Sequence, residues 1–169
     1  MPVSDQGIQK ERYSLIPRTL IFVTSQEHVL LIRGAPDKRL WADLFNGIGG
    51  HVEPGEDILT AARRELEEES GLVVPQLHLC GIITIDTGES PGVVIFVLRG
   101  VGDREKKLPA PGREGRLEWV AYERVESLPL VEDLPLLLPR VLAMQPGDPP
   151  FAAQYTYNSR GDLQITFSS

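Results

Sequence analysis

The sequence lacks the features that mark several broad classes of protein. Cysteine occurs once, at Cys80, so the chain cannot form an internal disulfide and offers no pair of thiols for a zinc site. No apolar run approaches the roughly 18–20 residues of a membrane-spanning helix, and the opening MPVSDQGIQKERYS lacks the hydrophobic core of a signal peptide. We therefore expect a cytoplasmic protein that does not enter a membrane.

Basic residues are in the minority as well. The chain has 17 Lys and Arg residues against 24 Asp and Glu residues, a formal net charge of −7. A broad nucleic-acid surface needs clustered Lys and Arg to neutralise phosphates, so we do not expect polymeric nucleic acid as a partner. A small phosphorylated molecule can still bind through a bridging cation.

Length and composition predict one globular domain. The chain has 169 residues, of which 41% are apolar, enough to bury a core of ordinary size. The polar first residues are expected to form a flexible arm over 1–12, followed by a single domain over 13–169. A monomer and a homodimer are both compatible with this composition.

Short segments rich in β-branched residues, separated by polar turns, predict a sheet. The expected strands are 19–24, 28–33, 77–85, 92–99, 117–122, 151–157 and 163–167. Helical spacing is found over 57–70 and in a later segment that contains Leu134 and Leu138. This order predicts an α+β fold, a sandwich in which a mixed sheet lies between helices. The last two strands are expected to form a hairpin that extends the sheet or provides a dimer edge.

The predicted helix 57–70 has clear ends. Asp57 is expected to cap its N-terminus, and Gly71 stands where glycine usually follows the last turn. At roughly 100° per residue the helix also carries an apolar stripe, which we expect to pack on the sheet. The members of the stripe are Ile58, Leu59, Ala62 and Leu66, and the opposite face has Arg63 and Glu67.

Three carboxylates crowd beside this stripe. Glu65, Glu68 and Glu69 share one arc at spacings i, i+3 and i+4. Like charges so placed on an exposed helix repel by about 0.2–0.5 kcal/mol per pair, and by more where water is excluded. Arg64 supplies only one positive charge, so a divalent cation with oxygen ligands, Mg²⁺ above all, fits the remainder. A solvated acidic face is the alternative.

The same stretch matches a longer pattern. From Gly50 to Leu72 the residues follow GX5EX7REUXEEXGU, where U is a bulky aliphatic residue, at every specified position. This is the Nudix box, and the chain resembles the Nudix hydrolase family, whose fold is an α/β/α sandwich. The resemblance implies Mg²⁺-dependent hydrolysis of a nucleoside diphosphate linked to another group, with Mn²⁺ as an alternative metal.

The resemblance also assigns roles to residues in and beside the box. Arg64 would orient the carboxylates, because its planar fork matches them better than Lys. Glu56 would support the joint between loop and helix. The implied metal ligands are the side chains of Glu65, Glu68 and Glu69 and the carbonyl of Gly49.

Nudix hydrolases commonly supply one more glutamate, as metal ligand or general base, from a loop like 102–115. Glu114 best fits that place, five residues before Trp119 of a predicted strand. Weaker candidates are Glu89, Glu105 and Glu118. The general base stays open among Glu65, Glu69 and Glu114.

Substrate recognition is expected outside the box. In the MutT-like branch of the family, which hydrolyses oxidised purine nucleotides, an asparagine at the place of Asn46 reads the purine, and an acidic pair before a helix contacts the base. Glu132 and Asp133 occupy that place here, with Glu as a longer first member. Without the resemblance, Asn46 is equally well a turn residue and the acidic pair an N-cap.

Features of other Nudix branches are missing. The region of Thr87 and Gly88 has neither the proline of ADP-ribose pyrophosphatases nor the tyrosine of dinucleoside polyphosphate hydrolases. We therefore expect a nucleoside triphosphate to be split into a monophosphate and pyrophosphate, with 8-oxo-dGTP as a candidate substrate. Two alternatives stay open: hydrolysis of another diphosphate (a nucleotide sugar, ADP-ribose or a dinucleoside polyphosphate), and a non-catalytic nucleotide-sensing domain.

Overall fold

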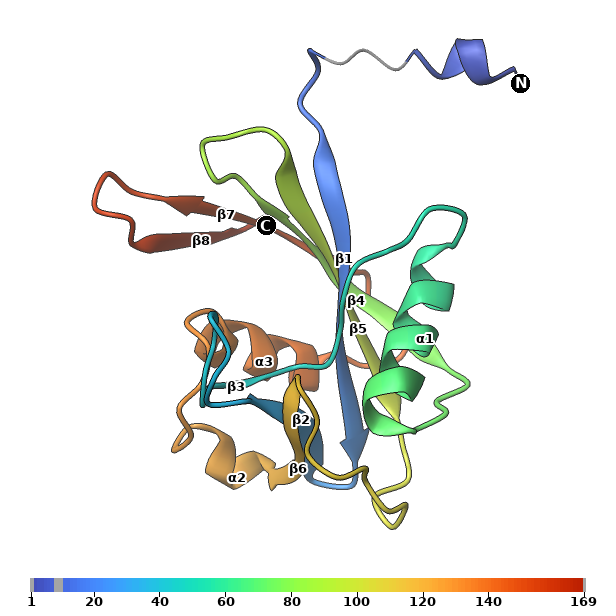
Figure 1. Cartoon of the computed structure of the whole chain (residues 1–169), viewed down its shortest axis with the longest axis vertical. Coiled ribbons are helices and arrows are strands. Elements are labelled where there is room, and N and C mark those ends of the chain that lie inside the picture. Colours follow the sequence, from blue (N-terminus) through green and yellow to red (C-terminus); the bar gives the residue numbers. More distant parts are fainter. Residues whose placement is uncertain (1, 8–10, 169) are drawn as a thin grey trace.

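A mixed β-sheet with helices on both faces forms the body of the computed structural model, which describes residues 2–7 and 11–168 (Figure 1). The strands lie in the order β3-β2-β1-β5-β4-β7-β8, and β6 also pairs with β2. The strand bounds are β1 Leu15–Ser25, β2 His28–Gly34, β3 Phe45–Asn46, β4 Leu77–Ile85, β5 Gly92–Val101, β6 Gly115–Ala121, β7 Phe151–Tyr157 and β8 Leu163–Phe167. The helices are η1 Val3–Gln6, α1 Ile58–Ser70, α2 Tyr122–Val125 and α3 Leu134–Ala143.

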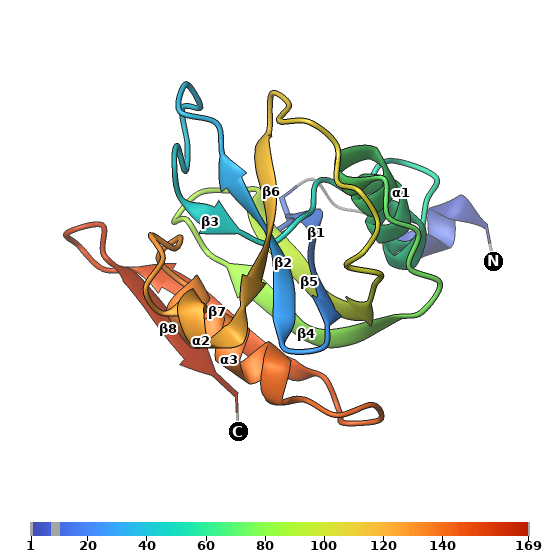
Figure 2. The same ribbon diagram turned by 90° about the horizontal axis from the view of Figure 1, so that it is seen from below.

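The sheet combines parallel and antiparallel pairs. β1 runs parallel to β5 and β4 runs parallel to β7, whereas the other neighbouring strands are antiparallel. The β7–β8 hairpin joins the sheet through β4, so the last two strands extend the sheet as predicted. Because α1 and α3 cover opposite faces (Figure 2), the predicted α+β sandwich is confirmed.

The central strands are buried on both sides. In β1 the side chains of Leu20 and Phe22 enter the core beneath α3, whereas Ile21 and Val23 enter the core beneath α1. This division follows from the two-residue period of a strand. It explains why β1 reads as one continuous apolar run rather than as an alternating pattern.

Helix α1 has the predicted ends. The Asp57 carboxylate accepts hydrogen bonds from the backbone N–H groups of Leu59 and Thr60, at 2.8 and 3.0 Å. Gly71 has the left-handed conformation, with φ 67°, and donates its N–H to the carbonyl of Glu67. These bonds satisfy backbone groups that a helix end otherwise leaves unpaired.

The apolar stripe of α1 needs one correction. Ala62 and Leu66 are buried as predicted, but Leu59 is 38% exposed and Ala61 is fully buried. Leu59 and Leu66 point in nearly the same direction from the helix axis but lie roughly 10 Å apart along it. Their different burial therefore depends on position along the helix. The last turns of α1 therefore pack on the sheet more closely than its first turn.

Two short elements differ from the prediction. β3 forms where Phe45 donates its N–H to the carbonyl of Pro129 and accepts a hydrogen bond from Val131. α2 begins at Tyr122, which had been expected to end a strand, and whose N–H donates to the carbonyl of Glu27. Both elements depend on backbone contacts between distant segments, which local patterns do not carry.

The N-terminal segment lies apart from the sheet, with η1 at its start (Figure 1). The predicted arm over 1–12 includes residues 1 and 8–10, which lie outside the described residues. The arm and the domain boundary at 13 therefore stay predictions. In the described part of the chain, no helix has the length and apolarity needed to cross a membrane.

Candidate active site

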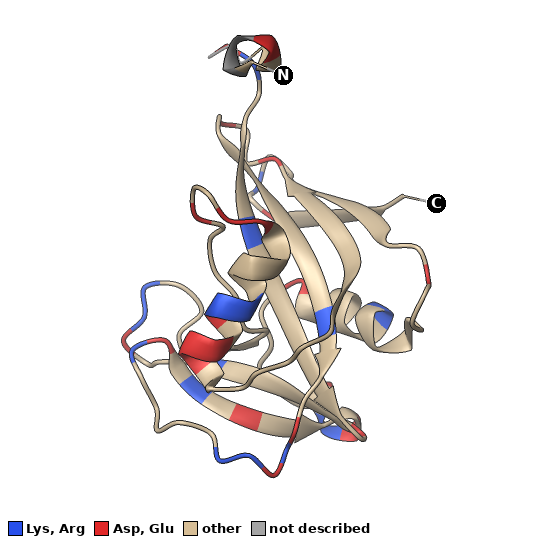
Figure 3. Ribbon diagram, turned by 90° about the vertical axis from the view of Figure 1, so that its right-hand side faces the viewer, with Lys and Arg blue, Asp and Glu red and all other residues tan. Residues whose placement is uncertain are grey.

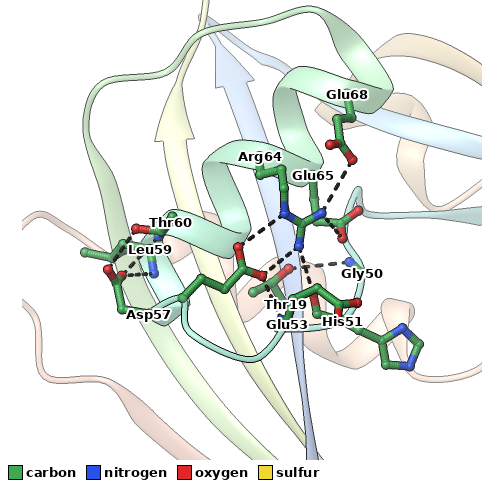
Figure 4. A network of polar contacts seen from close by, with 11 residues as sticks. Thr19, Gly50, His51, Glu53, Asp57, Leu59, Thr60, Arg64, Glu65 and Glu68 are labelled. Atoms are coloured by element: carbon green, nitrogen blue, oxygen red, sulfur yellow. Dashed lines mark hydrogen bonds and ion pairs between the residues drawn. The ribbon is translucent and has the colours of Figure 1, made fainter.

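The guanidinium of Arg64 is the centre of a network of polar contacts beside α1 (Figure 4). It donates two hydrogen bonds to the Glu56 carboxylate, at 2.7 and 3.2 Å, one to Glu65 at 2.8 Å and one to Glu68 at 3.4 Å. Another bond of 3.1 Å reaches the carbonyl of His51. A planar group with five N–H donors can hold several carboxylates at once, which a Lys ammonium does less well. Arg64 thus contacts the carboxylates that it was predicted to orient.

Glu56 connects the loop before α1 with the helix. Besides its bonds from Arg64, its carboxylate accepts a hydrogen bond of 2.7 Å from the N–H of Glu53. The contacts with Arg64 first, and that with Glu53 second, hold the pKa of Glu56 below its ordinary value. Both oxygens bond to the protein, an arrangement that suits a joint between loop and helix better than a metal ligand.

The stretch 48–51 lies along β1 and seats Glu65. β1 donates backbone hydrogen bonds to the carbonyls of Ile48 and Gly50, at 2.6 and 2.9 Å. In this antiparallel register the carbonyl of Gly49, which lies between them, points away from β1. A Cβ atom on Gly50 would collide with the Glu65 carboxylate, so glycine permits the close approach of helix and strand. The predicted carbonyl and carboxylate ligands therefore lie close together.

Glu69 stands among other carboxylates. Burial, followed by the charges of Glu65 and Glu114, raises the pKa of Glu69 from its ordinary 4.5 to about 7. Glu68 adds to this rise, and Lys38 opposes it. The acidic residues of α1 gather toward one end of the helix, beside a loop that carries both signs of charge (Figure 3). The predicted crowding of the carboxylates is thus present in the folded chain.

Glu114 lies in the loop between β5 and β6, close enough for its charge to act on Glu69. Its carboxylate is 2.5 Å from Nζ of Lys38, and its carbonyl accepts a hydrogen bond from the N–H of Ala35. Lys38 was missed in the sequence, because it lies in a loop without a motif. The only signal for it was the general need for positive charge beside the carboxylates.

The weaker candidate Glu118 faces away from α1. Its neighbours Leu117 and Trp119 pack in the core beneath α1, so the side chain between them points to the other face of the sheet. There it forms an ion pair of 3.2 Å with Arg116. Glu118 is therefore not a member of the carboxylate cluster.

The donor set suits a hard divalent cation. The predicted ligands are oxygen atoms only, and after burial the charges of Glu65 and Glu114 raise the pKa of Glu69, with Lys38 opposing them. As they stand, no three Asp, Glu, His or Cys side chains of the described residues are arranged to hold an ion. Arg64 holds two of the carboxylates, but the bond to Glu68 is its longest, and that side chain is 63% exposed. Glu68 can therefore turn toward a cation without loss of packing.

The predicted purine-reading residues come from two segments that the fold places side by side. β3 pairs with the chain before α3 through a bridge between Phe45 and Leu130. Asn46 consequently lies beside the segment that leads to Glu132 and Asp133. Asn46 and Gly49 are three positions apart, at most about 10 Å of extended chain, so the purine end and the carboxylate end belong to one site.

Asn46 is a strand residue opposite Ile32, so the alternative that it lies in a turn is wrong. Its side-chain oxygen accepts a hydrogen bond of 2.8 Å from the N–H of Gly47. This bond sets the orientation of the amide and leaves its NH₂ group, with two donors, for a ligand.

Asp133 occupies the N-cap position of α3, as the alternative interpretation predicted, but its side chain makes no capping hydrogen bond. Its carboxylate instead accepts a hydrogen bond of 3.2 Å from the hydroxyl of Tyr155 in β7. Burial raises the pKa of Asp133, and the bond from Tyr155 opposes this rise. Tyr155 was missed, because a position in a strand does not show which distant side chain it meets. The other member of the pair, Glu132, is exposed.

These features define a class of protein: an α/β/α sandwich whose helix presents clustered glutamates, with a short strand that lies beside a second group of polar residues. The model of the NUDIX domain family matches residues 15–141. Oxidized purine nucleoside triphosphate hydrolases of Danio rerio and Mus musculus are 36% and 35% identical to this chain. These alignments cover 73% and 71% of the chain and 78% of each relative.

The fold of this chain is also similar to that of a solved structure. The crystal structure of a MutT protein from Bacillus halodurans matches with a TM-score of 0.76 at 24% identity, and the match covers 91% of this chain and 98% of that one. The chain belongs to the Nudix family and is a pyrophosphohydrolase of that family. Nudix hydrolases use a divalent metal, in agreement with the oxygen-only donor set.

Proposed function

We propose that this enzyme hydrolyses purine nucleoside triphosphates to the nucleoside monophosphate and pyrophosphate, with oxidised purines such as 8-oxo-dGTP as preferred substrates. The observation that carries the proposal is the short stretch from Asn46 to Gly49, which joins the segment beside Glu132 and Asp133 to the glutamates of α1. A purine needs donors and acceptors, whereas a phosphate chain needs a cation. The two relatives described above support the same substrate class.

The metal in this proposal is Mg²⁺, with Mn²⁺ as a substitute. Its ligands would be the carbonyl of Gly49 and the carboxylates of Glu65, Glu68, Glu69 and Glu114. When bound, the cation supplies charge stabilisation for the phosphates and lowers the pKa of a bound water. Lys38 would then leave Glu114 or turn toward a phosphate oxygen, since its ammonium and the cation compete for one carboxylate.

The protein side chains divide the remaining work. Arg64 keeps Glu65 against the Gly50 backbone, and this contact aligns the carboxylate with the neighbouring Gly49 carbonyl. A general base takes a proton from the attacking water, and Glu69 suits this role among the three candidates, because Glu65 is paired with Arg64 and Glu114 with Lys38.

The purine end would choose the substrate. The NH₂ group of Asn46 donates to acceptor atoms of the base, and the carboxylates of Glu132 and Asp133 accept from its N–H groups. Removal of oxidised nucleotides from the precursor pool would be the consequence.

The proposal is tested by a substrate panel. Purified protein with Mg²⁺ is given the four dNTPs, 8-oxo-dGTP, ADP-ribose and Ap4A. Phosphate is measured after inorganic pyrophosphatase, which reports pyrophosphate from the triphosphates. For ADP-ribose and Ap4A, which have no terminal phosphate, it is measured after alkaline phosphatase, which acts only on their products. We expect the largest kcat/KM for 8-oxo-dGTP in the pyrophosphatase arm. A signal from ADP-ribose or Ap4A alone would assign another diphosphate, and no signal from any compound would favour a nucleotide-sensing domain.

A further inference from the structure

Tyr155 makes an unusual contact for a tyrosine in the core of a sheet. It is 3% exposed, and its neighbours in the sheet-side core beneath α3 are apolar. Its hydroxyl nevertheless donates to Oδ2 of Asp133, 22 residues away, at 3.2 Å. A buried tyrosine hydroxyl needs a partner, and here that partner is a residue of the proposed purine pocket.

The Asp133 carboxylate has few other duties in the fold. Its backbone carbonyl starts α3 by accepting from Leu136 and Leu137, but its side chain makes no cap. Among the described residues it forms no ion pair, and Tyr155 is the one other residue that donates a hydrogen bond to it; its own backbone N–H is a further donor. The second oxygen, Oδ1, accepts no hydrogen bond from another described residue, so it retains capacity to accept one from a ligand.

The protonation of the pair is set by its surroundings. Burial first, and the charge of Asp133 second, raise the pKa of Tyr155, so its hydroxyl keeps its proton at working pH. A hydroxyl that must donate makes Oδ2 an acceptor. Because the bond opposes the effect of burial on Asp133, it also favours the ionised carboxylate. The negative charge of the neighbouring Glu132 raises the pKa of Asp133 and so opposes the effect of the bond from Tyr155.

From this geometry we infer that Tyr155 is a positioning residue for substrate selection: it holds Asp133 as a hydrogen-bond acceptor whose Oδ1 faces the base. The inference rests on the proposed function. An ionised Asp133 only accepts hydrogen bonds, and it therefore favours a guanine-type base, which has two neighbouring donors, N1–H and N2–H₂. An adenine-type edge presents one acceptor, N1, beside one donor, so it pairs better with a protonated carboxyl. Tyr155 therefore biases the pocket toward guanine-type oxidised purines.

The test compares Tyr155→Phe with the wild type on 8-oxo-dGTP and 8-oxo-dATP. The variant removes one hydroxyl and keeps the ring that packs in the core. We expect the ratio of kcat/KM values, guanine type over adenine type, to fall about fivefold, the size of one hydrogen bond. The change should lie in KM, and the Mg²⁺ concentration for half-maximal activity should not move. If kcat/KM fell equally for both substrates and the melting temperature fell as well, Tyr155 would have a structural role, and the inference would be overturned.

Two further measurements separate the possible failures. Tyr157→Phe removes the hydroxyl of a 48% exposed tyrosine two residues further along β7, and it should leave the ratio unchanged. In an Asp133→Asn background, Tyr155→Phe should have no further effect on the ratio, because its action passes through the carboxylate. An unchanged ratio in Tyr155→Phe, with normal activity, overturns this inference alone. Absence of hydrolysis of both nucleotides by the wild type overturns the proposed function and this inference with it.

Discussion

The two ends of the candidate site are built in different ways. The carboxylate end comes mainly from one continuous stretch, in which Arg64 bonds to Glu56, Glu65 and Glu68, and distant loops add Glu114 and Lys38. The purine end is assembled from β3, the chain before α3, and β7, and its contacts join residues far apart in the chain. The carboxylate end is held by several charge-assisted hydrogen bonds from Arg64. At the purine end, the contact between distant side chains is the hydrogen bond from Tyr155 to Asp133.

This difference teaches how one fold can keep a reaction and change its substrate. Contacts at i, i+3 and i+4 persist whenever the helix forms, so the metal-binding chemistry follows from local sequence. Contacts between separate strands and loops change when any one of those segments changes. We therefore expect mutations at the helix end to act on kcat for every substrate, and mutations at the purine end to act on KM for particular bases.

The largest effect is expected from Glu69→Gln. Removal of the group proposed as base and ligand should lower kcat by about 10²- to 10⁴-fold for every substrate that the wild type hydrolyses. Steady-state phosphate release with saturating Mg²⁺ measures the change. The matched control is Glu67→Gln, an exposed glutamate of the same helix that should retain normal kcat. Equal activity of the two variants would contradict the assignment of Glu69.

A smaller loss is expected from Arg64→Lys. The variant keeps the charge but not the planar fork, so Glu65 and Glu68 lose their fixed positions, and kcat/KM should fall about 10- to 100-fold. The apparent affinity for Mg²⁺ should fall in the same titration, while the preference among bases stays. Arg63→Lys, on the exposed face of α1, is the control. A change of base preference in Arg64→Lys would break the proposed separation of the two ends.

The crowding of carboxylates should also appear as a pH-dependent stability of the metal-free protein. The folded pKa of Glu69, about 7, lies above its ordinary 4.5, so the folded state binds the proton more tightly. Its stabilising contribution is complete below pH 4.5 and is lost as the pH rises through 7. After allowance for solvent screening, the loss is on the order of 2 kcal/mol.

Urea unfolding in EDTA at pH 5, 6.5 and 8 measures this loss. The Glu69→Gln variant has no carboxylate that can ionise at position 69. The unfolding free energy of the wild type should therefore fall relative to that of the variant as the pH rises. Added Mg²⁺ should restore the wild type at pH 8, because a bound cation offsets the repulsion. A difference that is constant from pH 5 to pH 8 would show that Glu69 is not held in a crowded, partly buried position.

The smallest effect is expected at the purine end, from Asn46→Ala. Loss of the NH₂ donors should raise KM for 8-oxo-dGTP about tenfold and leave kcat within twofold. Asn158→Ala is a suitable control, since this asparagine also accepts backbone hydrogen bonds, but in the turn between β7 and β8. If kcat rather than KM falls in Asn46→Ala, the short stretch to Gly49 transmits the change to the carboxylates, and the two ends are less independent than proposed.

Much of the fold is predictable from local patterns, and the failures have a common cause. The strands, the caps of α1 at Asp57 and Gly71, and the sandwich of helices around a mixed sheet follow from periodicity and turn chemistry. β3 and α2 were missed, because each forms on backbone supplied by a distant segment. The exposure of Leu59 was missed because periodicity gives the angle around a helix, not the extent of the sheet along its axis.

The sequence by itself determined the carboxylate arc of α1, its arginine and its family, because these depend on spacing within one helix and its adjoining loop. Only the tertiary structure decided that Lys38 meets Glu114 and that Asp133 meets Tyr155 instead of capping α3. These contacts join segments whose relative positions are set by the packing of the whole sheet. The spacing of residues along one chain contains no measure of such distances, and so the contacts of the substrate-facing residues became visible only in the folded protein.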